Sequence, residues 1–271
     1  MPSFTEISTD KLSRLIGTPG APVLIDVRND EAFSADPRLI PGSVRKPFND
    51  VDQWGTEIRS PAVIICHRGA KLSHGVAAHL RVTGVQAETL EGGFEAWIKA
   101  GGLAVPEAKL PSRDAKGRTV WVTRARPKID RIACPWLIRR FVDPGAIFLF
   151  VPTPEVLMVA DRFGATAFDI EDVFWSHRGD RCSFDVMVEE FALQSEPLLR
   201  LATIVRAADT ARLDLAPEAA GLLAASLGLS RMFADDLDQL QAGLTLYDAF
   251  YRWCRDATDE AHNWPSAKKG N

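Results

Sequence analysis

The chain has 271 residues, of which 46% are hydrophobic and 25% charged. This length suits two domains, and the balanced composition excludes long disordered or fibrous segments. The formal net charge of -4 excludes a general attraction to nucleic acid or to anionic membranes, so we expect neither as a partner.

The four cysteines, Cys66, Cys134, Cys182 and Cys254, are far apart and form no CxxC pair. This spacing argues against a disulfide framework and against a structural zinc knuckle. The N-terminus has no charged segment followed by an apolar run, and no window of about 18 apolar residues occurs. We therefore expect a cytoplasmic protein with reduced thiols.

The first half alternates strand-like and helix-like segments. Apolar runs rich in Val and Ile predict strands at 21–28 and 62–66, and 85–93 is a third strand. Helical spacing with glycine stops predicts helices at 75–84 and 94–101. Such alternation predicts a parallel sheet covered by helices on both faces, with functional loops at the carboxyl ends of the strands.

Composition changes after Val105, where a polar, proline-containing stretch without periodicity predicts a linker. The predicted division is a first domain at 1–107, a linker at 108–118, a second domain at 119–258 and a tail at 259–271. The second domain begins with strands at 119–123 and 146–152 and a helix within 128–143. A short helix near 153–165 follows, and three further helices are expected at 195–213, 216–229 and 234–256. The second domain is thus α/β at its start and mainly helical afterwards.

Cys66 ends a buried strand and is followed by a glycine-containing turn and a helix. Backbone N–H groups converge at such a turn, and the helix N-terminus behind it favours a thiolate or a bound anion. Arg68, Lys71 and His67 add positive charge. Cys66 is therefore a candidate nucleophile, and the alternative is a small apolar residue at the end of a core strand.

The first half resembles the rhodanese-like sulfurtransferase family in five ordered stretches: LIDVRNDEAF, IPGS, VIICHRGAKLS, GVAAHLRVTGV and LEGGFEAWIKAG. The resemblance implies a parallel-sheet fold and a persulfide on Cys66. It also implies that Asp26 and Arg28 support the loop, and that the cradle around the persulfide consists of His67, Arg68, Gly69, Ala70 and Lys71. Sulfur transfer of this kind requires no cofactor. Its partners are a small sulfur donor, such as thiosulfate or a persulfide, and a thiol or cyanide acceptor.

The length of the loop separates this family from the phosphatases. Phosphatases place an arginine six positions after the cysteine, and Leu72 occupies that position here. Lys71 stands where many sulfurtransferases have arginine, so the positive charge is kept while the two-pronged guanidinium is lost.

The second half opens with a basic stretch. Between Arg113 and Arg140 there are nine basic residues and two acidic ones. This excess is typical either of a solvated face or of an oxyanion site. Further on, the segment 175–185 combines His177, Arg178 and Cys182 with two aspartates, Asp180 and Asp185, so a divalent metal ion is a possible cofactor. The metal identity is left open.

Cys134 has two interpretations. If a helix begins near Asp130, Cys134 shares an apolar face with Leu137 and Phe141 and belongs to the core. If the helix begins at Pro135, Cys134 is its N-cap and its thiolate is favoured. The apolar face favours the core.

Residues 118–255 resemble the C-terminal domain of the chromate-resistance regulatory protein family. The resemblance rests on RARPKIDRIACPWLIRRFVDP, HRGDRCSFD, ADTARLDLAPEAAGL and LYDAFYRWCR. It implies a link to chromate or to the similarly shaped sulfate. It also implies a set of site candidates: Arg124, Arg126, Lys128, Arg131, Cys134, His177, Arg178 and Cys182. A rhodanese-like domain stands where regulators of this family carry a DNA-binding portion, so a repressor role is not expected.

The expected function is transfer of sulfane sulfur through Cys66, joined to a second domain that binds an oxyanion or a metal. The alternative is a chromate sensor or resistance protein in which both domains only bind.

Overall fold

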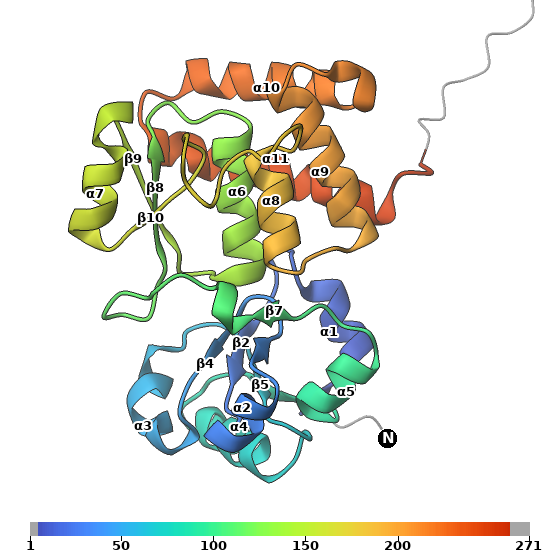
Figure 1. Cartoon of the computed structure of the whole chain (residues 1–271). Helices are drawn as coiled ribbons and strands as arrows, with labels where there is room; N and C mark the ends of the chain where they lie inside the picture. Colours follow the sequence, from blue (N-terminus) through green and yellow to red (C-terminus); the bar gives the residue numbers. More distant parts are fainter. Residues whose placement is uncertain (1–4, 261–271) are drawn as a thin grey trace, which may run out of the picture.

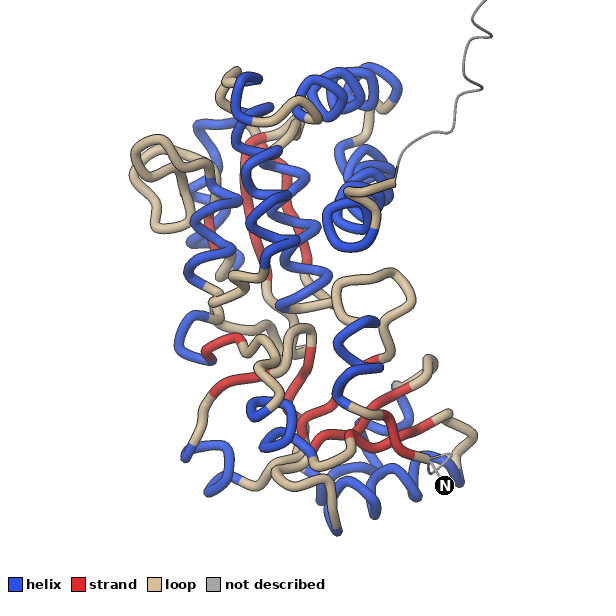
Figure 2. The backbone as a smooth tube through the Cα atoms, turned by 90° about the vertical axis from the view of Figure 1, so that its right-hand side faces the viewer, coloured by secondary structure: helices blue, strands red, loops and turns tan. Residues whose placement is uncertain are grey.

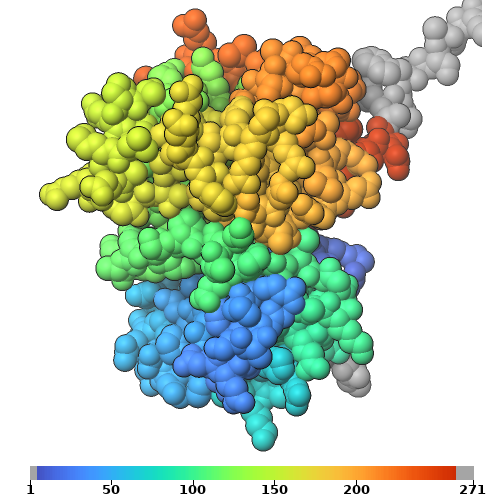
Figure 3. All heavy atoms as spheres, viewed as in Figure 1, coloured from blue at the N-terminus to red at the C-terminus, as the bar shows by residue number. Residues whose placement is uncertain are grey.

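The computed structural model describes residues 5–260, which form two stacked lobes (Figures 1 and 3). The first lobe holds the N-terminal sheet and the second holds most of the helices. Of the predicted tail at 259–271, all but two residues lie outside the described part of the chain.

The first lobe is built on a five-stranded, fully parallel sheet with strand order β1-β6-β5-β2-β4. This confirms the predicted parallel sheet. Its strands are β1 (Glu6–Ile7), β2 (Val23–Asp26), β4 (Ser43–Arg45), β5 (Ala62–Ile65) and β6 (Ala87–Leu90). Strand β5 is buried on both faces, as expected for a central parallel strand.

Helices cover both faces of this sheet. Alternate residues of β5 point to opposite faces, so the residues that pack against each of them show which helices cover which face. Val63 and Ile65 belong to a core cluster with α1 (Thr9–Leu15) and α5 (Gly93–Lys99), whereas Ile64 belongs to a second cluster with α3 (Val51–Trp54) and α4 (Lys71–Val82). The short α2 (Asp30–Ala35) follows β2.

The segment between the lobes is ordered. Strands β3 (Arg38–Leu39) and β7 (Val105–Pro106) pair antiparallel, and a 3-10 turn at Glu107–Lys109 follows. Asp114 then closes a turn by accepting the amides of Lys116 and Arg118, each at 2.9 Å. The stretch predicted as a linker is therefore held by local hydrogen bonds.

The second lobe contains a three-stranded parallel sheet of order β10-β8-β9, surrounded by helices (Figure 2). This agrees with the predicted α/β start and helical remainder. The strands are β8 (Val120–Arg124), β9 (Ile147–Val151) and β10 (Thr166–Ala167). The helices are α6 (Asp130–Leu137), α7 (Val156–Phe163), α8 (Ser183–Glu190), α9 (Glu196–Asp209), α10 (Ala219–Met232) and α11 (Asp236–Asp256).

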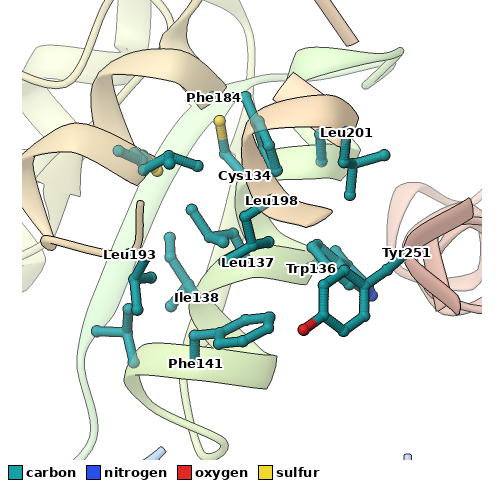
Figure 4. Packing of buried hydrophobic residues seen from close by; sticks show 14 of the residues in the cluster. Cys134, Trp136, Leu137, Ile138, Phe141, Phe184, Leu193, Leu198, Leu201 and Tyr251 are labelled. Carbon is teal, nitrogen blue, oxygen red and sulfur yellow. The ribbon is translucent and has the colours of Figure 1, made fainter. Parts of the chain in front are cut away.

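Helix α6 resolves the two interpretations of Cys134. The helix begins at Asp130 and contains Pro135, so Cys134 lies inside the helix and is not its N-cap. Its side chain is fully buried among apolar residues that include Leu137 and Phe184 (Figure 4). Pro135 lies inside the helix and lacks the N–H that would donate to the carbonyl four residues before it. The helical run nevertheless continues through a π-helical turn at Ile138–Val142.

One apolar core runs through both lobes. The cluster that covers one face of the first sheet also contains Trp136, Phe141 and Tyr251 of the second lobe. At the junction, the amide of Gly42 donates to the carbonyl of Phe141 at 2.7 Å. A Cβ on Gly17 would lie 2.2 Å from the Phe141 ring, so only glycine lets the ring pack this closely. The two lobes are joined by a shared core.

We predict that Phe141→Ala lowers the free energy of unfolding of the whole chain by about 3–5 kcal/mol, because it removes a fully buried ring and leaves a cavity. Thermal and chemical unfolding would measure this loss, with signals from both lobes shifting together. Phe163→Ala is the matched control, because Phe163 is 65% exposed. A loss confined to signals of the second lobe would contradict a shared core.

Candidate functional site

Cys66 lies at the carboxyl end of β5, one loop before α4. Its side chain is 5% exposed. The amide of Ala70 donates to Cys66 Sγ at 3.2 Å, and the Oγ of Ser73 lies 3.1 Å from the same sulfur. A backbone amide of the loop and a hydroxyl of the first turn of α4 therefore lie within hydrogen-bond distance of the sulfur.

The N-terminus of α5 holds the Cys66 loop in place. The amide of Phe94 donates to the carbonyl of Cys66 at 2.9 Å, and that of Glu95 donates to the carbonyl of His67 at 3.0 Å. Gly93 has φ +62°, and a Cβ there would lie 2.3 Å from the Cys66 carbonyl oxygen. Glycine is required at this position because two backbone segments pack directly against each other.

The three cationic side chains of the loop differ in how they are engaged. Arg68 forms an ion pair with Glu95 at 3.2 Å, and His67 Nε2 lies 3.9 Å from the same carboxylate. His67 Nδ1 is buried and has no hydrogen-bond partner among residues 5–260. Lys71 is exposed at the start of α4, and no ion pair engages it within the described chain. Lys71 is thus the cation of the loop that is available to a ligand.

A pocket of about 590 Å³ opens beside the sulfur. It is lined by residues of the loop and by the segment that follows β2, namely Arg28, Asn29, Glu31, Ala32, Ala35, Cys66, His67, Arg68, Ala70, Lys71 and Leu72. The pocket lining therefore combines the cationic residues of the loop with one carboxylate, that of Glu31.

Asp26 and Arg28 form a fully buried ion pair, with 2.6 Å between Oδ2 and Nη2. The guanidinium also donates to the carbonyls of Asp36 and Arg38, and it stacks on the Phe94 ring at 3.8 Å. Arg28 therefore ties the end of β2 to the helix that holds the Cys66 loop. Within residues 5–260, the hydrogen-bond partners of Cys66 Sγ are Ala70 and Ser73 and include neither member of this pair.

In the second lobe, His177 faces three carboxylates. Its Nε2 lies 3.4 Å from Asp130 Oδ2, 3.3 Å from Asp169 Oδ1 and 3.4 Å from Asp209 Oδ2. Asp130 begins α6, Asp169 follows β10, and Asp209 ends α9. The fold thus gathers four side chains from distant parts of the sequence.

The N-terminus of α8 orients two of these carboxylates. The amides of Ser183 and Phe184 donate to the two oxygens of Asp130, at 2.6 and 3.1 Å. The hydroxyl of Ser183 donates to Asp169 at 2.9 Å. Since Asp130 and Asp169 are almost completely buried, these bonds replace the water that the carboxylates lose on folding.

Electrostatics within this cluster shifts the pKa values in opposite directions. Burial raises the pKa of Asp130. The nearby carboxylates of Asp130, Asp169 and Asp209 raise the pKa of His177. Burial acts to raise the pKa of Asp169, but the proximity of His177 and the hydrogen bonds from Arg124 and Ser183 outweigh it, so the pKa of Asp169 is lowered. The carboxylates thus favour the protonated, positively charged form of the imidazole that lies between them.

The structure places three of the predicted basic candidates at this cluster. His177 is at its centre, and Arg124 and Arg131 form ion pairs with Asp169 at 2.9 and 3.3 Å. The remaining candidates lie elsewhere. Arg126 donates to the carbonyls of Ser230, Phe233 and Ala234; Arg178 pairs with Glu190; Lys128 is exposed.

The two thiol candidates of this lobe are closed off from solvent. Cys134 and Cys182 are fully buried, and burial raises the pKa of both thiols well above the usual value. Cys182 is the N-cap of α8, where its amide donates to Asp185 at 3.1 Å. Cys134 packs in the core inside α6, and Cys182 caps the N-terminus of α8.

Sequence reasoning did not single out Asp130, Asp169 or Asp209 as site residues. The clearest available signal was the position of Asp130, an acidic residue inside an otherwise basic stretch.

No helix within residues 5–260 is long and apolar enough to cross a bilayer.

Comparison with known proteins divides the chain at the same place as the structure. Residues 8–100 match the family model described as "Rhodanese-like domain", and residues 121–254 match the one described as "ChrB, C-terminal domain". Protein ChrB of Cupriavidus metallidurans is 37% identical over 131 residues, which make up 47% of this chain and 39% of that protein. The chain therefore spans well under half of this relative.

Two solved structures each resemble part of this chain. A rhodanese-related protein from Thermoplasma volcanium is 22% identical and covers 38% of this chain and 100% of its own, with a TM-score of 0.34. A rhodanese-like domain protein from Staphylococcus aureus is 26% identical over 34% of this chain and 90% of its own, with a TM-score of 0.31. The two family matches by themselves assign residues 8–100 to a rhodanese-like domain and residues 121–254 to a domain of the ChrB C-terminal family.

Proposed function

We propose that the first domain is a sulfurtransferase that carries sulfane sulfur as a persulfide on Cys66. The environment of the Cys66 sulfur supports this proposal most strongly. Cys66 Sγ accepts a hydrogen bond from the Ala70 amide and lies 3.1 Å from the Ser73 hydroxyl. It also borders a pocket lined by Lys71, which has no ion-pair partner among the described residues. A core cysteine needs neither the donors nor the pocket.

Ser73 allows the loop to serve both protonation states of the thiol. Its Oγ lies 3.0 Å from the carbonyl oxygen of Ala70 and 3.1 Å from Cys66 Sγ. When the sulfur is a thiol, the hydroxyl donates to the carbonyl. When the sulfur is a thiolate, the hydroxyl rotates and donates to it, so the thiolate has two donors.

The first chemical step is attack of the Cys66 thiolate on the outer sulfur of thiosulfate. A bond forms between the two sulfurs, the S–S bond of thiosulfate breaks, and sulfite leaves with the electron pair. A thiolate or cyanide then attacks the outer sulfur of the persulfide and releases the Cys66 thiolate. Lys71 stabilises the departing dianion, because its charge has no other partner in the loop.

A phosphatase reaction is not supported by this loop. Leu72, six positions after Cys66, is half-buried and packs against the core cluster on the α4 side of the sheet. It offers no group that could clamp the equatorial oxygens of a phosphate. The six-residue loop suits a small sulfur-carrying anion.

Chromate or sulfate binding by the second domain is the weaker proposal. Arg124 and Arg131 are paired with Asp169, and Arg126 is held by carbonyls. These guanidinium groups would have to break existing bonds to hold an oxyanion. Beside them, three carboxylates would repel a dianion.

We predict that Cys66→Ser lowers kcat/KM for transfer from thiosulfate to cyanide by more than about a thousandfold, because the nucleophile is lost. Thiocyanate formation measures the rate, and intact-mass analysis after thiosulfate treatment shows one added sulfur atom on the parent protein alone. Cys254→Ala is the control, because Cys254 is a buried residue of α11 remote from the loop. If Cys66→Ser and the parent form thiocyanate at the same rate, Cys66 does not carry the sulfur, and the proposed sulfurtransferase role of this domain is wrong.

We predict that Lys71→Ala lowers kcat/KM for thiosulfate about tenfold, the effect of losing about 1.4 kcal/mol of charge stabilisation. The loss should be smaller with an uncharged alkyl persulfide, because no dianion departs. Lys99→Ala provides the comparison, since Lys99 is an exposed lysine at the end of α5. An equal loss with both donors would show that Lys71 acts on loop structure and not on donor charge.

A further inference from the structure

We propose that the second domain binds one divalent metal ion between Asp130, His177 and Asp209, with Asp169 beside it. The ligand atoms of the first three residues all lie within 4.8 Å of one another. They come from the start of α6, the loop before α8 and the end of α9. The fold therefore builds a compact donor set of one imidazole and two carboxylates.

The spacing of these atoms matches metal ligands better than hydrogen-bonded partners. Nitrogen and oxygen atoms that share a hydrogen are usually 2.7–3.2 Å apart. His177 Nε2 is 3.3–3.4 Å from an oxygen of each of three aspartates. Two ligands about 2.1 Å from one ion, at a tetrahedral angle, are about 3.4 Å apart.

The number of hydrogen-bond donors in the cluster also favours a metal ion. Nε2 carries at most one hydrogen, so a protonated His177 can satisfy one of the three carboxylates that face it. No hydrogen bond and no second ion pair engages the carboxylate of Asp209 within the described chain. A cation among the four groups would satisfy all of them at once, and it would take the place of the imidazole proton, which leaves to solvent.

The charges around the cluster suit a divalent ion. Arg124 and Arg131 neutralise Asp169. Asp130 and Asp209 form no ion pair with an arginine or lysine among residues 5–260, so two carboxylates face the ion directly. The three carboxylates and two guanidinium groups together carry a net charge of -1 beside a neutral imidazole, which favours a cation.

The surrounding residues orient the ligands as outer partners do in metal sites. Asp130 is fixed by the amides of Ser183 and Phe184, and Asp169 by the hydroxyl of Ser183. Access is also provided, because the side chains of His177 and Asp209 are 41% and 20% exposed. Mixed imidazole and carboxylate ligands favour Mn²⁺, Fe²⁺ or Zn²⁺ over Ca²⁺.

The test uses the full chain after removal of metals by a chelator. Titration calorimetry with Mn²⁺ and with Zn²⁺ should show one saturable site for at least one of the two ions, and for Mn²⁺ the electron spin resonance signal of the free ion should fall in proportion. Asp209→Asn keeps the shape of the side chain and should weaken binding at least about a hundredfold, because it removes a charged ligand. Asp214→Asn is the matched control, because Asp214 is an exposed aspartate paired with Arg212 in the adjacent turn.

Absence of saturable binding of either ion, or equal binding by the Asp209→Asn and Asp214→Asn variants, would overturn the proposal. His177→Ala is the second variant. Because His177 lies in an exposed loop, its replacement should leave the circular dichroism of the chelator-treated protein unchanged, and it should also abolish metal binding. Cys66→Ser should bind the metal as the parent does, so the outcome is independent of sulfur transfer.

Discussion

The shared apolar core between the two lobes is the constraint on which the rest of the structure depends. The sheet of the first domain needs a cover over the face that carries Val63 and Ile65, and the second lobe extends the core that covers it. Phe141 lies at the junction, with its ring against Gly17 and its carbonyl bonded to the amide of Gly42. Burial of this face in a common core fixes the two domains to each other.

One helical run connects this junction to the acidic cluster. Helix α6 begins at Asp130, whose carboxylate faces His177, and the π-helical turn that follows it ends just after Phe141. The same rigid segment therefore places a ligand candidate at one end and the domain contact at the other. Sulfur chemistry and metal binding would thus take place on one rigid scaffold.

The two sites differ in how they achieve their charge. The Cys66 loop gathers donors and a lysine around a single sulfur, so it suits an anion. The cluster around His177 gathers carboxylates whose charges are only partly neutralised by Arg124 and Arg131, so it suits a cation. The link to chromate implied by the second-domain family has no prepared anion site among these arginines, which already have partners.

The sequence by itself determined the parallel sheet of the first domain and the position of Cys66 between a buried strand and the helix that follows it. These features depend on residues adjacent along the chain, where strand, turn and helix periodicity decide the local geometry. Only the tertiary structure decided that Cys134 is a core residue, because two helix starts were compatible with its neighbours. Only the tertiary structure also showed that four side chains of the second domain meet, namely those of Asp130, Asp169, His177 and Asp209. These residues are separated by as many as 79 positions in the sequence. The packing of α6, α8 and α9 brings their side chains together.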